Sequence, residues 1–386
     1  MKWPVYDEQQ IEDVVNVLRS GQVNAWTGPH VDDFEKAYAR YLGREHAIAV
    51  ANGSAALDIA LDILDLQPGE EVIVTPRSFV ASASCIPQAG GKPVFADVDR
   101  ESQNITAATI APKITSRTRA IIAVHLGGWP CDMDDIMELA EQHNLIVIED
   151  CAQAHGAELY GKPIGSFGHI ACFSFCQDKI ISTGGEGGLI ALDDEDLFRK
   201  AWARKDHGKN YDTVMEQSHE PGFRWLHDSF GTNLRMTSIQ AVLGLRQLQH
   251  LPAWTDKRAE NAMVLRNTLR GSPAVRIPMP KQHIKHAYYR FYTFMDPRKL
   301  KRSWSRDRII EESNRRGFPC FSGSCSEIYR EKAFVDANLA PKRRLPVARE
   351  LGETSLAYLV SPTLNRGAME FYARGVREVI NQATLH

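Results

Sequence analysis

Apolar residues along the first half of the chain recur in two alternating patterns. Short apolar runs predict buried strands, which we place at 47–50, 71–75, 93–97, 120–124, 145–148, 169–175 and 188–192. Between several of these runs, apolar residues recur every three to four positions, and this spacing predicts helices at 54–64, 79–88 and 134–143. The alternation of strand and helix is typical of an α/β domain with a mainly parallel sheet.

The same spacing predicts further helices on both sides of this region, at 7–18, 31–42, 237–251, 252–270 and 306–316. A predicted strand at 288–294 lies among the later helices. We therefore predict a large domain over residues 1–250, which includes the N-terminal helix, and a smaller C-terminal α/β domain over residues 251–386.

The composition narrows the class of protein. Of 386 residues, 43% are apolar and 24% are charged, as in a soluble globular protein. Lys and Arg total 46 and Asp and Glu total 48, so the net charge of −2 favours neither nucleic acid nor an anionic membrane. We find no signal peptide and no apolar run of about 18 residues. Seven cysteines then indicate reduced thiols and a cytoplasmic protein.

The segment Asn-Gly-Ser-Ala-Ala-Leu at 52–57 lies at a predicted strand-to-helix junction. Glycine permits close approach of the backbone, and the free N–H groups at the start of a helix bind phosphate. A helix cap by Ser54 explains the same residues, and the segment alone favours that simpler interpretation.

The predicted strand at 145–148 continues into Glu-Asp-Cys-Ala-Gln-Ala-His-Gly at 149–156. An acidic residue at the carboxyl end of a buried parallel strand lies where α/β proteins form their sites. Asp150 would suit a pyridine cofactor, because a carboxylate keeps the ring nitrogen protonated. A helix-capping role for Asp150 explains the segment equally well.

Lys179 stands between the predicted strand at 169–175 and the run Gly-Gly-Glu-Gly-Gly at 184–188. A lysine amine forms a Schiff base where its site lowers its pKa, and glycines leave room for a cofactor beside it. Ser174 offers a hydroxyl to a phosphate. A surface lysine before a glycine loop is the simpler explanation of this segment alone.

Two other patterns lack a necessary part. The segment 156–162 resembles a phosphate-binding loop, but Pro163 stands where Ser or Thr must bind magnesium. Cys172 and Cys176 have no second ligand pair at zinc spacing. We therefore expect no metal centre.

Together, the three segments at 52–57, 149–156 and 173–188 resemble the DegT/DnrJ/EryC1/StrS family of sugar aminotransferases. These enzymes depend on pyridoxal 5'-phosphate (PLP) and have the aspartate-aminotransferase fold (type I), with a mainly parallel seven-stranded sheet and a smaller C-terminal α/β domain. The resemblance extends to the segments 26–29, 75–82, 94–99 and 231–236. It is strong over roughly 20–250 and weak beyond.

The resemblance implies roles for individual residues. Lys179 would hold PLP as a Schiff base and shuttle the proton, and Asp150 would pair with the pyridinium nitrogen. Gln153 would contact the ring hydroxyl, and Phe79 would stack on the ring. The phosphate would be held by Gly53, Ser54, the amide of Ala55, Ser174 and, across a homodimer with shared sites, Asn233.

The implied reaction transfers an amino group from L-glutamate to a keto sugar, namely a nucleotide-linked 4-keto or 3-keto deoxysugar. The implied pathway is surface polysaccharide or deoxyaminosugar biosynthesis. A cyclitol ketone as acceptor and PLP-dependent sugar dehydration remain alternatives. Dehydratases of the family replace the lysine with histidine, so Lys179 disfavours that branch. A catalytically inactive regulatory protein is disfavoured by the intact set of Lys179, Asp150 and Gln153. The segment 176–178 departs from the family pattern and leaves the sugar undetermined.

Overall fold

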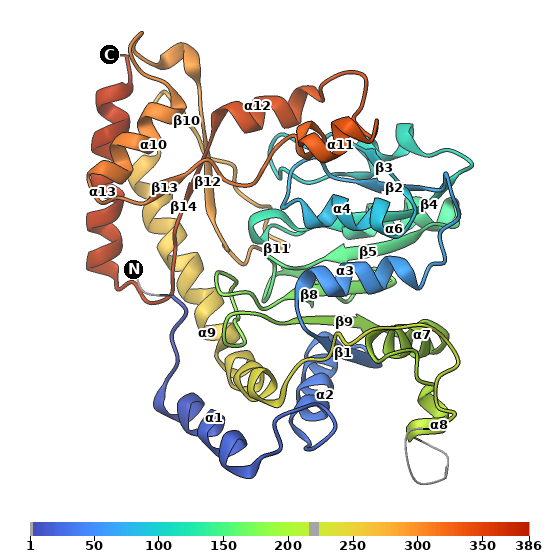
Figure 1. Cartoon of the computed structure of the whole chain (residues 1–386). Helices are drawn as coiled ribbons and strands as arrows, with labels where there is room; N and C mark the ends of the chain where they lie inside the picture. The colour runs from blue at the N-terminus through green and yellow to red at the C-terminus, as the bar shows by residue number, and fades with distance from the viewer. Residues whose placement is uncertain (1–2, 216–223, 386) are drawn as a thin grey trace.

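The computed structural model describes residues 3–215 and 224–385. Its centre is a seven-stranded sheet in the order β1-β9-β8-β5-β4-β2-β3 (Figure 1). The strands are β1 His46–Val50, β2 Glu71–Val74, β3 Lys92–Phe95, β4 Thr118–Val124, β5 Ile146–Asp150, β8 Ile170–Ser174 and β9 Gly188–Leu192. In this sheet β9 runs in the direction opposite to the other six strands. The predicted mainly parallel seven-stranded sheet is confirmed.

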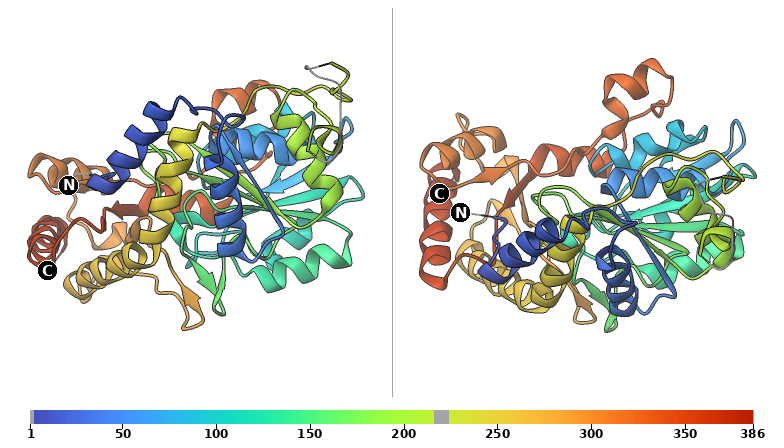
Figure 2. Two further views of the ribbon diagram at one scale, coloured as in Figure 1. Left: turned by 90° about the horizontal axis from the view of Figure 1, so that it is seen from below. Right: turned by 60° about the horizontal axis from the view of Figure 1, so that its bottom comes forward.

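Helices cover both faces of this sheet, with α3 and α4 on one face and α6 on the other (Figure 2). The helices of this part are α1 Glu8–Ser20, α2 His30–Leu42, α3 Gly53–Asp62, α4 Ala81–Gln88, α5 Ala107–Ile110, α6 Met133–Gln142, α7 Glu195–Lys205 and α8 Tyr211–Met215. The central strands β5, β8 and β9 are buried almost completely. Burial on both faces explains why these strands appear in the sequence as continuous apolar runs.

The C-terminal part forms a second, antiparallel sheet in the order β10-β12-β14-β13. Its elements are β10 Val275–Arg276, β12 Phe291–Met295, α10 Arg306–Arg315, β13 Cys320–Phe321, α11 Lys332–Asp336, α12 Pro346–Thr354, β14 Ser355–Tyr358 and α13 Arg366–Ala383. It has its own hydrophobic core, which includes Leu265, Phe291, Tyr358 and Val376. The chain nevertheless returns to the first core at Phe334, which packs on Phe95. A domain boundary at residue 250 stays a prediction.

One long helix, α9 Ser238–Leu269, connects the two parts. The prediction of two helices that meet at Pro252 is wrong, because the helix continues through this proline. The first half of α9 packs on α1 and α2 and the second half on α13. Tertiary packing of both halves outweighs the local cost of the proline, which removes one backbone hydrogen bond.

A small sheet made of β6 Glu158–Leu159, β7 Lys162–Pro163 and β11 Ile284–Lys285 lies beside the main sheet. The segment 156–162, which resembles a phosphate-binding loop in sequence, therefore belongs to a β-hairpin and does not begin a helix. Among the described residues, no helix combines the length and the apolar character needed to cross a membrane.

Candidate active site

A cavity of about 530 Å³ lies at the carboxyl ends of β5 and β8, where α3 begins. In parallel α/β sheets this edge is the usual position of a site. Seven of the predicted site residues line the cavity: Gly53, Ser54, Phe79, Asp150, Gln153, Ser174 and Lys179. Residues that are far apart in the sequence are thus brought to one place.

The start of α3 forms one wall of the cavity. Asn52, and not Ser54, caps this helix, because its Oδ1 accepts a hydrogen bond from Ala55 N at 2.8 Å. That N–H is therefore engaged within the chain, and the role of the Ala55 amide toward a phosphate stays a prediction. The N–H groups of Gly53 and Ser54 precede it in the first turn, where a helix provides no acceptor. They are the amides that suit an anion.

Gly53 permits a close approach between α3 and β8. A Cβ atom at position 53 would lie 2.5 Å from the Cβ of Ser174, a distance that side chains do not tolerate. On β9, a Cβ at Gly188 would likewise lie 2.3 Å from the Asn52 carbonyl oxygen. The two glycines therefore bring the Ser174 hydroxyl beside the free amides of α3, as a phosphate cradle requires.

Asp150 ends β5, and its carboxylate is buried in the cavity wall. Ser82 Oγ donates a hydrogen bond to Oδ2 at 2.7 Å, and Ala152 N donates to Oδ1 at 3.1 Å. These two donors fix the carboxylate orientation. Ser82 lies within the segment 75–82 that resembles the family, but the sequence assigned it no role.

Gln153 follows β5 by one turn and is held by the main chain. Its Oε1 accepts a hydrogen bond from Gly127 N at 2.7 Å. The side-chain NH2 group therefore remains as the donor that this cavity-lining residue offers. Such a donor suits the oxygen of a ring hydroxyl.

Lys179 follows β8 and contacts the residue before it. Its Nζ lies 3.2 Å from Asp178 Oδ1 and 5.2 Å from the centre of the Tyr289 ring. The Tyr289 hydroxyl donates a hydrogen bond to Asp178 Oδ2. Burial raises the pKa of Asp178, but the charge of Lys179 and the hydrogen bonds from Tyr289 and Lys179 outweigh it and lower the pKa below its usual value. Sequence reasoning missed Tyr289, which lies in the region of weak resemblance.

His155 contacts the main chain of Ser174, which contributes a hydroxyl to the phosphate cradle. One ring nitrogen, Nε2, lies 2.8 Å from the Ser174 carbonyl oxygen, and Nδ1 lies 2.8 Å from the Tyr38 hydroxyl. Burial lowers the pKa of His155 to about 4, so the ring is neutral at pH 7. A neutral ring donates from Nε2 to the carbonyl and accepts from Tyr38 at Nδ1.

Glu149 precedes Asp150 but faces away from the cavity. Its carboxylate accepts hydrogen bonds from the backbone of Gly165, Phe167 and Gly168, and it lies 3.1 Å from His125 Nε2. His125, Glu149 and Cys151 come close enough to hold a metal ion. However, these hydrogen bonds already occupy the carboxylate, and His125 Nδ1 accepts one from Cys131 N. His125 and Glu149 therefore hold the loop at 165–168 in place against β5.

Two predicted residues differ from the rest in exposure. Phe79 lines the cavity but is 66% exposed. Asn233 is exposed and lies outside this cavity. Its Oδ1 accepts a hydrogen bond from Arg235 N at 3.4 Å. A role for Asn233 at this chain's own cavity is therefore not supported, and its role across a dimer stays a prediction.

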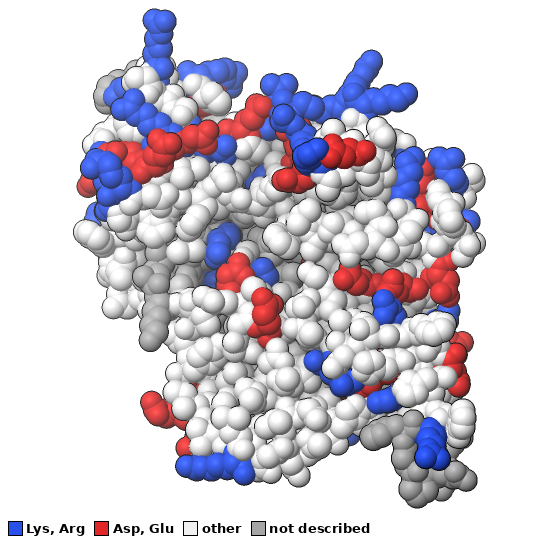
Figure 3. Space-filling model, in the orientation of Figure 1, with Lys and Arg blue, Asp and Glu red and all other residues white. Residues whose placement is uncertain are grey.

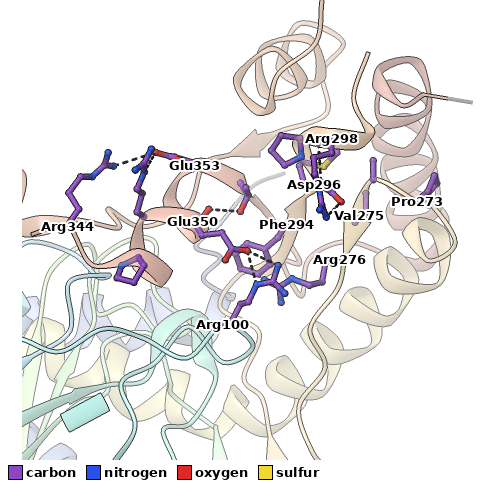
Figure 4. A pocket seen from close by; sticks show the side chains of 16 residues that line it. Arg100, Pro273, Val275, Arg276, Phe294, Asp296, Arg298, Arg344, Glu350 and Glu353 are labelled. Atoms are coloured by element: carbon purple, nitrogen blue, oxygen red, sulfur yellow. Dashed lines mark hydrogen bonds and ion pairs between the residues drawn. The ribbon is translucent and has the colours of Figure 1, made fainter. Parts of the chain in front are cut away.

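A larger cavity, of about 710 Å³, lies between β10, β12 and α12 (Figure 4). Each of its arginines pairs with a carboxylate: Arg100 with Glu350, Arg276 with Glu101, Arg298 with Asp296, Arg344 with Glu327 and Arg349 with Glu353. Within the described chain, one nitrogen of Arg276 has no hydrogen-bond partner. No lysine lines this cavity, and it contains none of the predicted site residues.

The main sheet, the phosphate cradle, the buried carboxylate and the lysine together define an enzyme of fold type I that uses PLP, and the residues present fit this cofactor. The chain belongs to the DegT/DnrJ/EryC1/StrS aminotransferase family, whose model matches residues 4–373. Enzymes of this family are PLP-dependent aminotransferases, and so is this protein.

Similar proteins agree with this assignment over nearly the whole chain. The X-ray structure of the aminotransferase from Psychrobacter cryohalolentis is 50% identical, with a TM-score of 0.96 and coverage of 99% of both chains. GDP-perosamine synthase of Escherichia coli O157:H7 is 32% identical over 91% of this chain and 90% of that protein. UDP-N-acetyl-3-dehydro-alpha-D-glucosamine 3-aminotransferase of Acidithiobacillus ferrooxidans is 33% identical over 90% of this chain and 88% of that protein.

Proposed function

We propose that this aminotransferase moves the amino group of L-glutamate to the ketone of a nucleotide-linked deoxysugar, at C4 or C3. The observation that carries the proposal is the convergence of Lys179, Asp150 and Gln153 on one cavity beside the cradle at Ser174. The names of two relatives, one for GDP-perosamine and one for a UDP-linked 3-dehydro sugar, support the substrate class. The nucleotide differs between them, so the proposal leaves the base open.

When bound, PLP supplies a carbonyl carbon that takes up the amino group and a ring that accepts electrons. Gly53, Ser54 and Ser174 would hold its phosphate, and Asp150 would face the ring nitrogen. Lys179 Nζ would hold the cofactor and then, as a free amine, carry the proton. Gln153 would donate to the ring oxygen, and Phe79 would cover one face of the ring.

A substrate screen tests this proposal. The PLP-loaded enzyme is incubated with L-glutamate and a set of GDP-, UDP- and dTDP-linked 4-keto and 3-keto sugars, and the products are identified by mass spectrometry. We expect one or a few amino sugar nucleotides to form together with 2-oxoglutarate. Amination of a cyclitol ketone alone, or loss of water without gain of nitrogen, would contradict the proposal.

We also propose that the enzyme acts as a homodimer in which each site is completed by Asn233 of the partner subunit. Two aromatic side chains that precede Asn233 in the sequence are exposed in the single chain: Trp225 is 89% and Phe230 is 100% exposed. Large aromatic side chains at the surface are typical of a protein interface. On the face in Figure 3, wide uncharged areas separate several groups of charged side chains.

Subunit complementation tests the shared site. Lys179→Ala and Asn233→Ala chains, each impaired alone, are mixed and allowed to exchange. A hybrid dimer with shared sites has one site with both defects and one with neither, so part of the activity returns. If exchange is verified and no activity returns, each subunit houses a complete site.

We further propose that the reaction takes place in the cytoplasm. All seven cysteines are free thiols in the structure. Thiols persist in reducing compartments, which supports this location.

A further inference from the structure

Among the described residues, Arg258 is a buried cation without a hydrogen-bond acceptor. It lies in the second half of α9 and is 2% exposed. Within residues 3–215 and 224–385, Arg258 forms no hydrogen bond or ion pair, and its Nε is fully buried and unsatisfied. A buried guanidinium that lacks an acceptor is strongly unfavourable, so its retention requires an explanation.

This guanidinium lies next to the loop that carries Lys179. It stacks over the indole of Trp3 at 5.0 Å from the ring centre. The same indole donates a hydrogen bond from Nε1 to the Lys179 carbonyl oxygen at 2.8 Å, and it packs edge-on against Trp254. Trp3 therefore connects Arg258 directly to the backbone of the lysine.

A second arginine, Arg290, approaches the same place from the start of β12. Its guanidinium lies over the Tyr289 ring, 4.4 Å from the ring centre. The same Tyr289 ring also contacts Lys179. Arg290 Nη2 is 4.0 Å from Asp178 Oδ2, which is too far for a hydrogen bond. The carboxylate of Asp178 is already engaged by Lys179 and Tyr289.

The two arginines are close enough to affect each other. Burial, together with the smaller effect of the Arg290 charge, lowers the pKa of Arg258 to about 9. Among residues 3–215 and 224–385, Asp178 is the one acidic side chain in contact with this group, against three cations: Lys179, Arg258 and Arg290. Arg290 Nη1 donates a hydrogen bond to the Tyr289 carbonyl oxygen at 3.2 Å, whereas the buried Nε of Arg258 has no acceptor. The neighbourhood thus has an excess of positive charge and unused guanidinium donors.

We infer that Arg258 and Arg290 form an anion subsite beside Lys179 that binds an oxyanion group of a substrate. The inference rests on the proposed function, in which two substrates visit the site in turn. That reaction offers two sources of such a group: a carboxylate of the amino donor and the diphosphate of the nucleotide sugar. Guanidinium groups bind carboxylates and phosphates through paired hydrogen bonds, so both sources fit the same chemistry.

Equilibrium titrations of the PLP-loaded enzyme test the subsite. Glutarate serves as an unreactive dicarboxylate, and UDP and GDP serve as diphosphates. Calorimetry gives the Kd of each probe for the wild-type protein and for Arg258→Met and Arg290→Met. Arg298→Met is the matched control, because Arg298 is exposed and pairs with Asp296 on the far side of β12.

We expect each site variant to raise the Kd of one class of probe at least about tenfold, as loss of a hydrogen bond to a charged group predicts. A weaker glutarate complex with unchanged UDP and GDP assigns the donor carboxylate. The reverse result assigns the diphosphate. Unchanged affinity for all three probes in both variants would overturn the subsite.

Thermal unfolding separates binding from a purely structural role. Arg258→Met replaces an unpaired buried charge with an apolar chain of similar length, so Tm should stay the same or rise. A large fall in Tm with unchanged probe affinities would show that Arg258 only supports Trp3. Because the titrations need no turnover, they remain decisive even if no keto sugar is converted. The product screen by mass spectrometry reports failure of the proposed function independently.

Discussion

Two of the cavities in the described part of the chain differ in a way that size does not predict. The larger one, beside α12, measures about 710 Å³, and a carboxylate faces every arginine that lines it. The smaller one, of about 530 Å³, contains groups with unused hydrogen-bonding capacity: the first amides of α3, the Gln153 NH2 group and the Ser174 hydroxyl. A ligand can satisfy groups of the second kind.

The difference shows that unpaired polar groups identify a site better than volume or charge. Exposed ion pairs such as Arg349 and Glu353 are screened by water and contribute little. Around Lys179, in contrast, glycines and buried donors hold polar atoms in fixed positions at the edge of a rigid sheet. The following changes test this comparison in order of decreasing effect.

Removal of the lysine should have the largest effect. Lys179→Ala deletes the amine that would hold the cofactor and carry the proton, so the rate of conversion of L-glutamate to 2-oxoglutarate should fall at least about 10³-fold. Single-turnover kinetics measures this rate, and Lys332→Ala, at an exposed lysine of α11, is the control. In wild-type protein, borohydride should attach PLP to the peptide that contains Lys179; attachment at another lysine would refute the assignment.

Loss of the buried charge should be the next largest effect. Asp150→Asn keeps the shape of the side chain and leaves the phosphate contacts intact, so PLP binding should be partly retained. The chemical step should slow by about 100-fold or more, because an oriented charge is lost at the ring nitrogen. Ser82→Ala removes the 2.7 Å hydrogen bond to Asp150 and the 2.9 Å hydrogen bond with Ser78 Oγ but keeps the carboxylate charge, so it should have a smaller effect. Near-normal turnover of Asp150→Asn would leave Asp150 with a structural role alone.

A methyl group in the cradle should weaken cofactor binding without abolishing it. Gly53→Ala places a Cβ 2.5 Å from Ser174 Cβ, so either α3 or β8 must shift. An overpacking cost of roughly 1–3 kcal/mol predicts about a tenfold or greater rise in the Kd of PLP. Spectroscopic titration of the cofactor-free protein measures it. Gly367→Ala, where the nearest atom is 3.7 Å away, should bind PLP normally; equal effects of both variants would contradict the cradle.

The smallest effect should come from the larger cavity. Glu353→Gln removes the carboxylate that pairs with Arg349 on α12, at a position where both side chains are about half exposed. We expect a loss of less than about 0.5 kcal/mol in the free energy of unfolding and no change in PLP affinity or turnover. Chemical denaturation and steady-state assays measure these quantities. A marked loss of activity would show that this cavity takes part in function.

The sequence predicted the main sheet well and the C-terminal part less well. Strands buried on both faces leave continuous apolar runs, and all seven were visible. The sequence predicted two helices that meet at Pro252, because proline has a low local propensity for a helix interior. In the fold, tertiary packing outweighs this propensity, and α9 continues through the proline. Asn52 rather than Ser54 caps α3, since the cap depends on the backbone angles where the helix begins.

By itself, the sequence determined the family, the sheet and the candidate set of Lys179, Asp150 and Gln153, because these depend on local patterns and on motifs in a fixed order. Only the tertiary structure decided which other groups join them. Trp3 and Tyr289 lie 176 and 110 positions from Lys179 along the chain and yet contact its loop. The unpaired state of Arg258 is likewise invisible in a sequence, because hydrogen-bond satisfaction is a property of a folded neighbourhood.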